Sequence, residues 1–146
     1  MTAPARRATL EWREIAVGDA LPELVLEVTA TVIVAGAIAT RDFMPVHHDR
    51  AYANAQGAPD IFMNILSSTA HCSRFLTDWA GPEAMVKRLS IRLGVPVFPD
   101  STLTFSGTVT GTSRAGDEGV VEVEFRATNE LGDHVTGTAV LGLLAP

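Results

Sequence analysis

The sequence predicts an α+β domain in which a curved antiparallel sheet wraps around one central helix. Apolar residues recur at helical spacing over residues 61–79. The second half of the chain instead alternates apolar and polar residues with a period near two, which is typical of long strands. Strands that follow a single helix bury their apolar face by folding over that helix, so we expect these two halves to form one layered domain.

The N-terminal half is predicted to contain short elements. We expect residues 1–16 to form a flexible extension of a single domain that spans residues 1–146. Residues 28–40 are small and apolar, and the β-branched run at residues 31–34 favours a strand there. Residues 49–57 are predicted to form a short helix that begins at an Asp cap and ends at a glycine.

The central helix and the strands of the second half have clearer boundaries. Gly81 and Pro82 end the helical pattern, and Ser67, Ser68, Thr69 and Ala70 make the middle of the helix small. Strands are predicted over residues 86–95, 102–112, 120–128 and 135–144, with turns at residues 114–119 and 129–133.

Composition excludes several classes of protein. A chain of 146 residues fits one domain, and no charge-free apolar run reaches the roughly 20 residues that cross a bilayer. The first residues contain no apolar signal core, so we expect a soluble, cytoplasmic protein without a membrane partner. The net charge of −6 disfavours nucleic acid as a partner. The single cysteine, Cys72, predicts neither a disulfide nor a metal site and is expected to be buried.

An Asp and a His five positions apart, Asp42 and His47, are followed by Asp49 within residues 39–49. This segment resembles the hydratase motif of the MaoC-like enoyl-CoA hydratase family, and residues 89–103 resemble that family's second recurring stretch. Five stretches, two of them within residues 39–49, are similar to the small MaoC-like subunit of actinobacterial steroid enoyl-CoA hydratases: residues 41–43, 46–49, 60–66, 77–82 and 131–135. The resemblance covers residues 17–144.

The resemblance implies a hot-dog fold and a lyase that adds water across the 2,3 double bond of a steroid side-chain acyl-CoA in cholesterol degradation. It also implies a larger MaoC-like partner subunit, in a heterotetramer. From spacing alone, an Asp and a His near a turn are usually interpreted as capping or solvated groups. The resemblance implies instead that Asp42 and His47 position and deprotonate the water. Because Pro45 disfavours helix at Met44, the two side chains are expected to meet through a loop. Neither a metal nor a cofactor is expected, since coenzyme A is part of the substrate.

One departure from the family concerns the thioester oxyanion. The family opens its central helix with a His-Gly pair, and we assign that place here to Ile61 and Phe62. Backbone N–H groups of Phe62, Met63 and Asn64 at the start of the helix are candidate oxyanion donors. Lys87, Arg88 and Arg92 are candidates for the coenzyme A phosphates, although a position on a solvated strand face is the favoured interpretation for each of them taken singly.

Other polar residues have simpler interpretations. His48 is expected to lie at the surface, and Asp49 is expected to cap a helix. His71 is expected to pack within the central helix with its ring nitrogens hydrogen-bonded, and His134 to lie at the exposed start of a strand. Two alternative functions stay open. The chain could be a catalytically silent partner of the larger subunit, or a hot-dog thioesterase, since one fold hosts several reactions.

Overall fold

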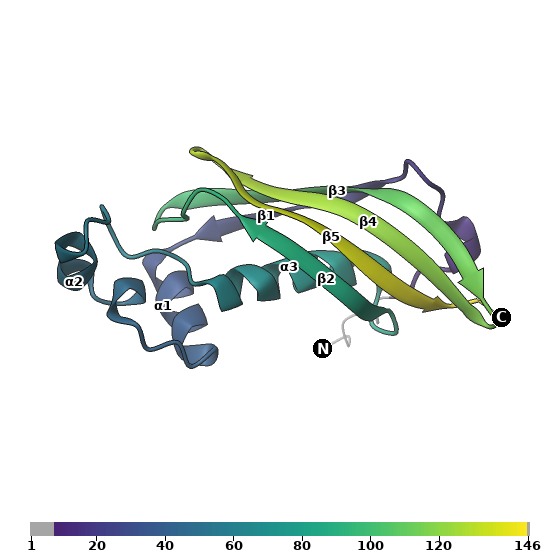
Figure 1. Cartoon of the computed structure of the whole chain (residues 1–146), viewed down its shortest axis with the longest axis horizontal. Helices are drawn as coiled ribbons and strands as arrows, with labels where there is room; N and C mark the ends of the chain where they lie inside the picture. The colour runs from purple at the N-terminus through teal and green to yellow at the C-terminus, as the bar shows by residue number, and fades with distance from the viewer. Residues whose placement is uncertain (1–7, 146) are drawn as a thin grey trace, which may run out of the picture.

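In the part of the chain that the computed structural model describes, residues 8–145, five strands form one antiparallel sheet that curves over a long helix (Figure 1). The elements in chain order are η1 (Trp12–Glu14), β1 (Ala20–Val28), α1 (Ala30–Ala39), η2 (Pro45–His47), α2 (Arg50–Ala55), α3 (Ile65–Ala80), β2 (Met85–Leu93), β3 (Ser101–Ala115), β4 (Glu118–Asn129) and β5 (Gly132–Leu144).

The strands lie in the order β1-β3-β4-β5-β2, so β1 and β2 form the two edges. Consecutive hairpins connect β3 to β4 and β4 to β5. Gly116 lies in the first turn and Gly132 begins β5 directly after the second, and their φ angles of 64° and 125° suit glycine. The four strands predicted in the second half are confirmed, with ends that differ by a few residues.

The core lies between the sheet and α3. Alternate residues of β4 point toward the helix, and Val121, Val123, Phe125 and Ala127 are buried while the residues between them are more exposed. Phe75 of α3 packs its ring 5.8 Å from that of Phe105 and 6.3 Å from that of Phe125. This packing confirms the sheet-over-helix arrangement that the two periodicities predict.

The central helix begins four residues later than expected. The side chain of Asn64 accepts a hydrogen bond from the N–H of Ser67 and caps α3. Residues 61–63 lie outside the helix, and the N–H of Met63 donates to the carbonyl of Val97 at 3.0 Å. The residues at the helix start are therefore Met63 and Asn64, and the assignment of Ile61 and Phe62 to that place is wrong.

The strand predicted within residues 28–40 is wrong, because residues 30–39 form α1. Thr29 caps this helix through its hydroxyl, which accepts from the N–H of Val32 at 3.2 Å. Alanines occupy several of its positions, and Ile33 and Ala37 are buried in the core. Capping and tertiary packing outweigh the β propensity of the run at residues 31–34.

Two further elements complete the N-terminal half. The short helix predicted at residues 49–57 is confirmed as α2, capped by Asp49 and followed by Gly57 at a φ of 90°. Strand β1 was not predicted. A bulge between Leu21 and Leu24 interrupts its alternation, so the pattern is regular only over its second half.

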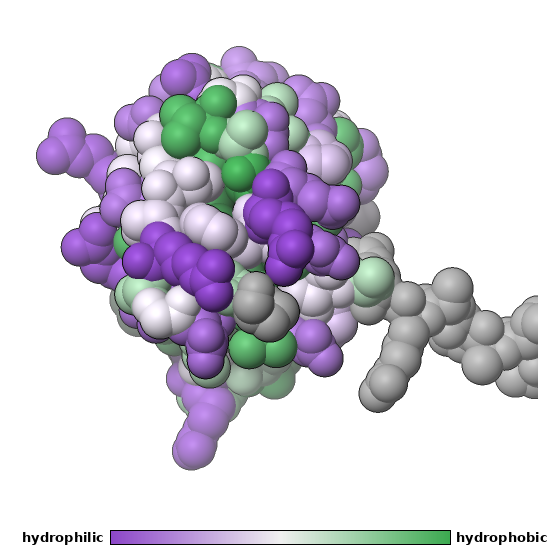
Figure 2. All heavy atoms as spheres, turned by 90° about the vertical axis from the view of Figure 1, so that its right-hand side faces the viewer, coloured by the Kyte–Doolittle hydropathy of each residue, from purple (hydrophilic) through white to green (hydrophobic). Residues whose placement is uncertain are grey.

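The predicted flexible extension, residues 1–16, lies partly outside the described residues, which begin at residue 8. The N–H of Leu10 donates to the carbonyl of Ala80 at 2.9 Å. Trp12 packs on the sheet beside Gly119, where an added Cβ would lie 2.1 Å from its ring. Figure 2 shows this end of the molecule, where hydrophilic side chains surround a smaller hydrophobic area.

No helix within residues 8–145 is long and apolar enough to cross a membrane.

Candidate active site

Asp42 follows α1 and is held by a Schellman turn at the end of that helix. The N–H of Asp42 donates to the carbonyl of Ala37 at 2.9 Å, and that of Arg41 donates to Ile38 at 3.0 Å. Arg41 occupies the left-handed position of this turn, with a φ of 58°. The hydrogen bonds of this turn therefore fix the backbone position from which the Asp42 side chain extends.

A close contact between α1 and α3 brings that carboxylate to the start of α3. A Cβ on Gly36 would lie 2.3 Å from Oγ of Ser67, so glycine allows the two helices to approach. Thr40 closes α1 by donating its hydroxyl to the carbonyl of Gly36 at 2.8 Å. The last turn of α1 and the first turn of α3 thus lie against each other.

His47 reaches the same place from η2, a short helix that begins at Pro45. Its side chain is buried, and Nδ1 lies 2.7 Å from the carbonyl oxygen of Phe62. Because a carbonyl only accepts, Nδ1 carries a hydrogen and donates it. The other ring nitrogen, Nε2, lies 3.5 Å from Oδ2 of Asp42. The structure therefore brings together the two residues that the sequence singled out.

The Asp42 carboxylate has two hydrogen-bond donors. Nδ2 of Asn64 donates to Oδ2 at 2.9 Å, and the N–H of Met44 donates to Oδ1 at 3.3 Å. The bond from Asn64 lowers the pKa of Asp42 most; the Met44 bond and the charge of His47 lower it further, and partial burial opposes them. Asp42 is consequently an ionised acceptor beside an imidazole.

His134 is buried, so its predicted exposed position is wrong. Its Nδ1 donates to the carbonyl of Val95 at 2.7 Å, and its Nε2 lies 2.8 Å from Oγ of Ser68. Ser68 Oγ is also 3.2 Å from the carbonyl oxygen of Asn64. Desolvation lowers the pKa of His134, and the bond to Val95 opposes this shift. The chain position of His134, just after a turn, gave no sign of this burial.

Two of the three predicted oxyanion amides are already engaged. The N–H of Phe62 donates to Val46 at 3.3 Å and that of Met63 to Val97 at 3.0 Å, so the structure does not support these two as oxyanion donors. The backbone amide of Asn64 remains a prediction. Helix geometry also leaves the amides of Ile65 and Leu66, in the first turn of α3, without intrahelical acceptors.

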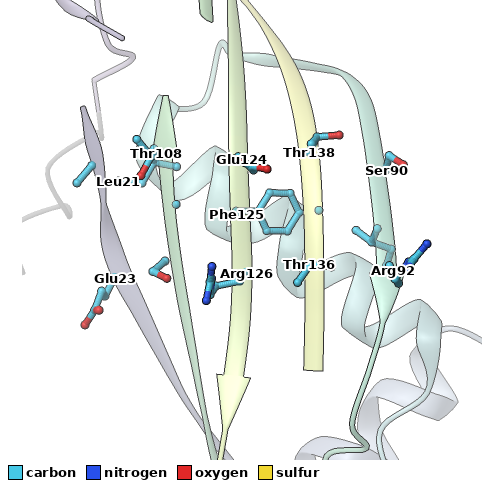
Figure 3. Close-up of a pocket in the computed structure, with 15 residues that line it drawn as sticks. Leu21, Glu23, Ser90, Arg92, Thr108, Glu124, Phe125, Arg126, Thr136 and Thr138 are labelled. Carbon is cyan, nitrogen blue, oxygen red and sulfur yellow. The ribbon is translucent and has the colours of Figure 1, made fainter. Parts of the chain in front are cut away.

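The predicted phosphate-binding cations lie on the edge strand β2. Lys87 pairs with Glu118 at 2.5 Å. Arg92 lines an open groove of about 780 Å³ that crosses all five strands, on the face of the sheet away from α3 (Figure 3). Arg88, four residues earlier on the strand, is exposed. The lining of this groove does not include Asp42 or His47, so a phosphate role for these cations stays a prediction.

Large apolar side chains are exposed on the segments that flank Asp42 and Asn64. They are Ile38 (56% exposed), Phe43 (63%), Met44 (48%), Ile65 (53%) and Leu66 (48%), and we call them the apolar rim. Exposed apolar groups gathered around a polar pair are typical of a binding surface rather than of a solvated face.

The remaining predictions concern single residues. His48 is exposed and Asp49 caps α2, as predicted. Cys72 is buried, also as predicted, and its burial raises its pKa to about 12. His71 is half-buried within α3, and desolvation lowers its pKa. Within residues 8–145, no group of three or more His, Cys, Asp or Glu side chains is arranged to hold a metal ion.

Comparison with known proteins shows that the chain is similar to a hydratase subunit. The family model described as MaoC like domain matches residues 18–131. The chain is 51% identical over 127 residues to the 3-oxo-4,17-pregnadiene-20-carboxyl-CoA hydratase beta subunit of Mycobacterium tuberculosis, which covers 87% of this chain and 95% of that protein.

Solved structures agree. A chain in the crystal structure of the ChsH1–ChsH2 complex from Mycobacterium tuberculosis is 50% identical, with a TM-score of 0.82 over 88% of this chain and 98% of that chain. The R-hydratase PhaJ1 from Pseudomonas aeruginosa, at 23% identity, gives a TM-score of 0.81 over 94% of this chain and 86% of that chain. The second likeness bears on the fold alone, and it confirms the hot-dog fold that the sequence predicts.

Proposed function

The chain belongs to the MaoC-like domain family, and from that premise we propose that it is a catalytic subunit of a steroid side-chain enoyl-CoA hydratase. In this proposal it adds water across the 2,3 double bond of a steroid acyl-CoA during the degradation of a sterol side chain. The similar beta subunit from Mycobacterium tuberculosis is named as a hydratase of a pregnadiene carboxyl-CoA, which supports this substrate class. No cofactor takes part, because coenzyme A belongs to the substrate.

The observation that carries the proposal is the arrangement of Asp42 and His47. A water molecule held against both Asp42 Oδ2 and His47 Nε2 would have its oxygen free to face a substrate carbon. Since Nδ1 of His47 donates to Phe62, its Nε2 is the nitrogen that accepts a proton in the neutral ring. A half-buried carboxylate beside a buried, oriented imidazole is the arrangement that positions and deprotonates a water molecule in this proposal.

The reaction balances without another reactant. The water oxygen forms a bond to the β-carbon while Nε2 of His47 takes one of its protons, and the ionised Asp42 stabilises the imidazolium that results. The electron pair of the double bond moves onto the α-carbon and the thioester oxygen. The imidazolium then returns its proton to the α-carbon, which restores the pair and completes the hydration.

Charge on the thioester oxygen needs hydrogen-bond donors. The backbone amides at the start of α3, those of Asn64, Ile65 and Leu66, are the groups we assign to it, because the helix dipole also favours negative charge there. Lys87, Arg88 and Arg92 remain candidates for the coenzyme A phosphates, with the two arginines better placed because Lys87 is paired with Glu118.

The proposed assembly is a heterotetramer with a larger MaoC-like subunit. The apolar rim supports this assembly, because five large exposed apolar side chains on the segments that flank Asp42 and Asn64 are typical of a surface that binds protein or substrate. The similar protein is itself a beta subunit, and the similar crystal structure is that of a two-protein complex. We further propose a cytoplasmic location, where a buried free thiol such as Cys72 stays reduced.

The test is to purify the chain with and without its larger partner and to assay hydration of 3-oxo-4,17-pregnadiene-20-carboxyl-CoA. We expect activity in the assembled complex and loss of that activity in Asp42→Asn. Hydration that depends only on the partner's residues would identify this chain as a silent subunit. Release of free coenzyme A without hydration would identify a thioesterase.

A further inference from the structure

Three buried polar side chains lie close to the Asp42–His47 pair, and hydrogen bonds connect them to it and to one another. Asn64, Ser68 and His134 are 1%, 1% and 4% exposed, and they come from the start of α3 and the start of β5. Burying polar groups in a small domain is costly unless each one is hydrogen-bonded, so the pattern of their bonds is informative.

The amide of Asn64 has only one possible orientation. Its Oδ1 accepts from the N–H of Ser67 at 3.1 Å, and only an oxygen can do so. Its nitrogen must therefore face the other way, where Nδ2 donates one hydrogen to Asp42 Oδ2 and the other to Thr40 Oγ1, both at 2.9 Å. Every donor of the Asn64 amide is used.

These bonds restrict the Asp42 carboxylate. Oδ1 is held by the N–H of Met44 and Oδ2 by Asn64, so rotation of the carboxylate would break one bond or the other. The oxygen that Asn64 holds is the one that lies 3.5 Å from Nε2 of His47. Asn64 thus determines which oxygen meets the imidazole.

The backbone of Asn64 is fixed from the opposite side. Since Nδ1 of His134 donates to Val95, its Nε2 accepts in the neutral ring, and the hydroxyl of Ser68 donates to it. Ser68 also donates its own N–H to the carbonyl of Asn64 at 3.1 Å. The first turn of α3 is therefore tied to β5 and to the loop at Val95.

We propose that Asn64 is a positioning residue for Asp42, and that Ser68 and His134 hold Asn64 in place. This inference rests on the proposed function, because it assigns a role relative to the carboxylate that orients water. Asn64 would fix Oδ2 toward His47 and keep the carboxylate ionised. Capping α3 does not by itself require an asparagine, since Ser and Asp cap helices equally well. Only the amide adds a donor for the carboxylate.

Two variants separate positioning from capping. Asn64→Asp keeps an oxygen for the N–H of Ser67 but places a second carboxylate against Asp42. Asn64→Ser keeps a capping hydroxyl, adds no charge and cannot reach Asp42. Asn129→Asp is the matched control: it makes the same chemical change in a residue whose Nδ2 donates to the carbonyl of Pro96 at the end of β4.

The experiment measures kcat and KM against pH in the assembled complex, with 3-oxo-4,17-pregnadiene-20-carboxyl-CoA as substrate, together with the Tm of each variant. Besides Asn64, the charge that acts on Asp42 is that of His47, so both groups bear on the profile. We expect the acidic limb of kcat/KM to move upward by about one pH unit or more in Asn64→Asp, and in the same direction but less in Asn64→Ser. We expect kcat to fall about tenfold or more in both, with a smaller change in KM.

The control should keep the parent profile. A lower Tm in Asn64→Ser with an unmoved acidic limb and unchanged kcat would overturn the proposal, because it would leave Asn64 as a helix cap only. An equal shift in Asn129→Asp would overturn it too, because the effect would then follow from added charge. Asp42→Asn, measured alongside, separates failure of the proposed function from failure of the positioning role. If Asp42→Asn retains full activity, the proposed function fails. If Asp42→Asn is inactive while both Asn64 variants behave as the parent, only the positioning role of Asn64 fails.

Discussion

Nε2 of His47 lies 3.5 Å from Oδ2 of Asp42, although Asp42 lies in the loop after α1 and His47 lies in η2. The Schellman turn after α1 places the carboxylate, and the bond from Nδ1 to Phe62 orients the ring. Each residue is thus held by a contact that does not involve the other, which is how a reactive pair is kept in place without substrate.

Asp42→Asn and His47→Ala are each expected to lower the hydration rate at least about 100-fold, because each removes a group that binds or deprotonates the water. The assembled complex should still form, as judged by gel filtration. His48→Ala is the control, since His48 is the exposed neighbour of His47 and should keep the parent rate. Full activity in either of the first two variants would remove the catalytic assignment.

The lowered pKa of Asp42 gives a stability prediction with a definite sign. A carboxylate whose pKa is lower in the folded state contributes stability above its unfolded value, near 3.9, and this contribution is lost as the pH falls through the folded pKa. Asp42→Asn should therefore have a lower Tm than the parent at pH 7, and the difference should shrink at pH 3. A difference that grows on acidification would contradict the direction of the shift.

Gly36→Ala is expected to destabilise the protein despite the better helix propensity of alanine. The new Cβ would lie 2.3 Å from Oγ and 3.2 Å from Cβ of Ser67, so the buried side chain of Ser67 would have to rotate and α1 to shift slightly from α3. Overpacking of this kind costs about 1–3 kcal/mol, against about 1 kcal/mol gained in propensity. Urea unfolding measures the balance. Gly36→Ala combined with Ser67→Ala should recover part of the loss, whereas a stabilising Gly36→Ala would show that the helices are not in tight contact.

The chain without its larger partner is expected to be poorly soluble or homodimeric, because the apolar rim would be left in water. Light scattering on the purified chain tests this. Replacing Ile65 and Leu66 by serine should improve the behaviour of the isolated chain and weaken its capture by the partner. A monodisperse monomer with full hydratase activity would contradict the proposed assembly.

A steroid acyl group should be preferred over a short one in the assembled complex. Fused rings can bury roughly 100–200 Å² more apolar area than a four-carbon chain, which contributes about 2.5–5 kcal/mol at about 25 cal/mol per Å² before ordering costs. Only about 1.4 kcal/mol of this is needed for the expected tenfold higher kcat/KM with the pregnadiene carboxyl-CoA than with crotonyl-CoA. Equal values would indicate an ordinary fatty-acyl hydratase.

Much of the fold follows from local patterns in the sequence. The alternation in residues 118–144 and the helical spacing up to Trp79 are direct consequences of one buried face on each element, and both are confirmed. Asp49 and Gly57 likewise allowed the beginning and the end of α2 to be predicted from the sequence. Asp42 and His47 were recognisable because their spacing is part of a family motif.

The tertiary structure decided what local patterns left open. Residues 30–39 became a helix because a capping threonine and the contact of Gly36 with Ser67 outweigh the β propensity of four residues. Asn64 became the start of α3 and a donor to Asp42 because the amides of Phe62 and Met63 donate to distant carbonyls. His134 became buried because it meets Ser68 across 66 positions of the chain. Such contacts join residues far apart in sequence, so no local periodicity encodes them, and only the packed sheet and helix bring their atoms within hydrogen-bonding distance.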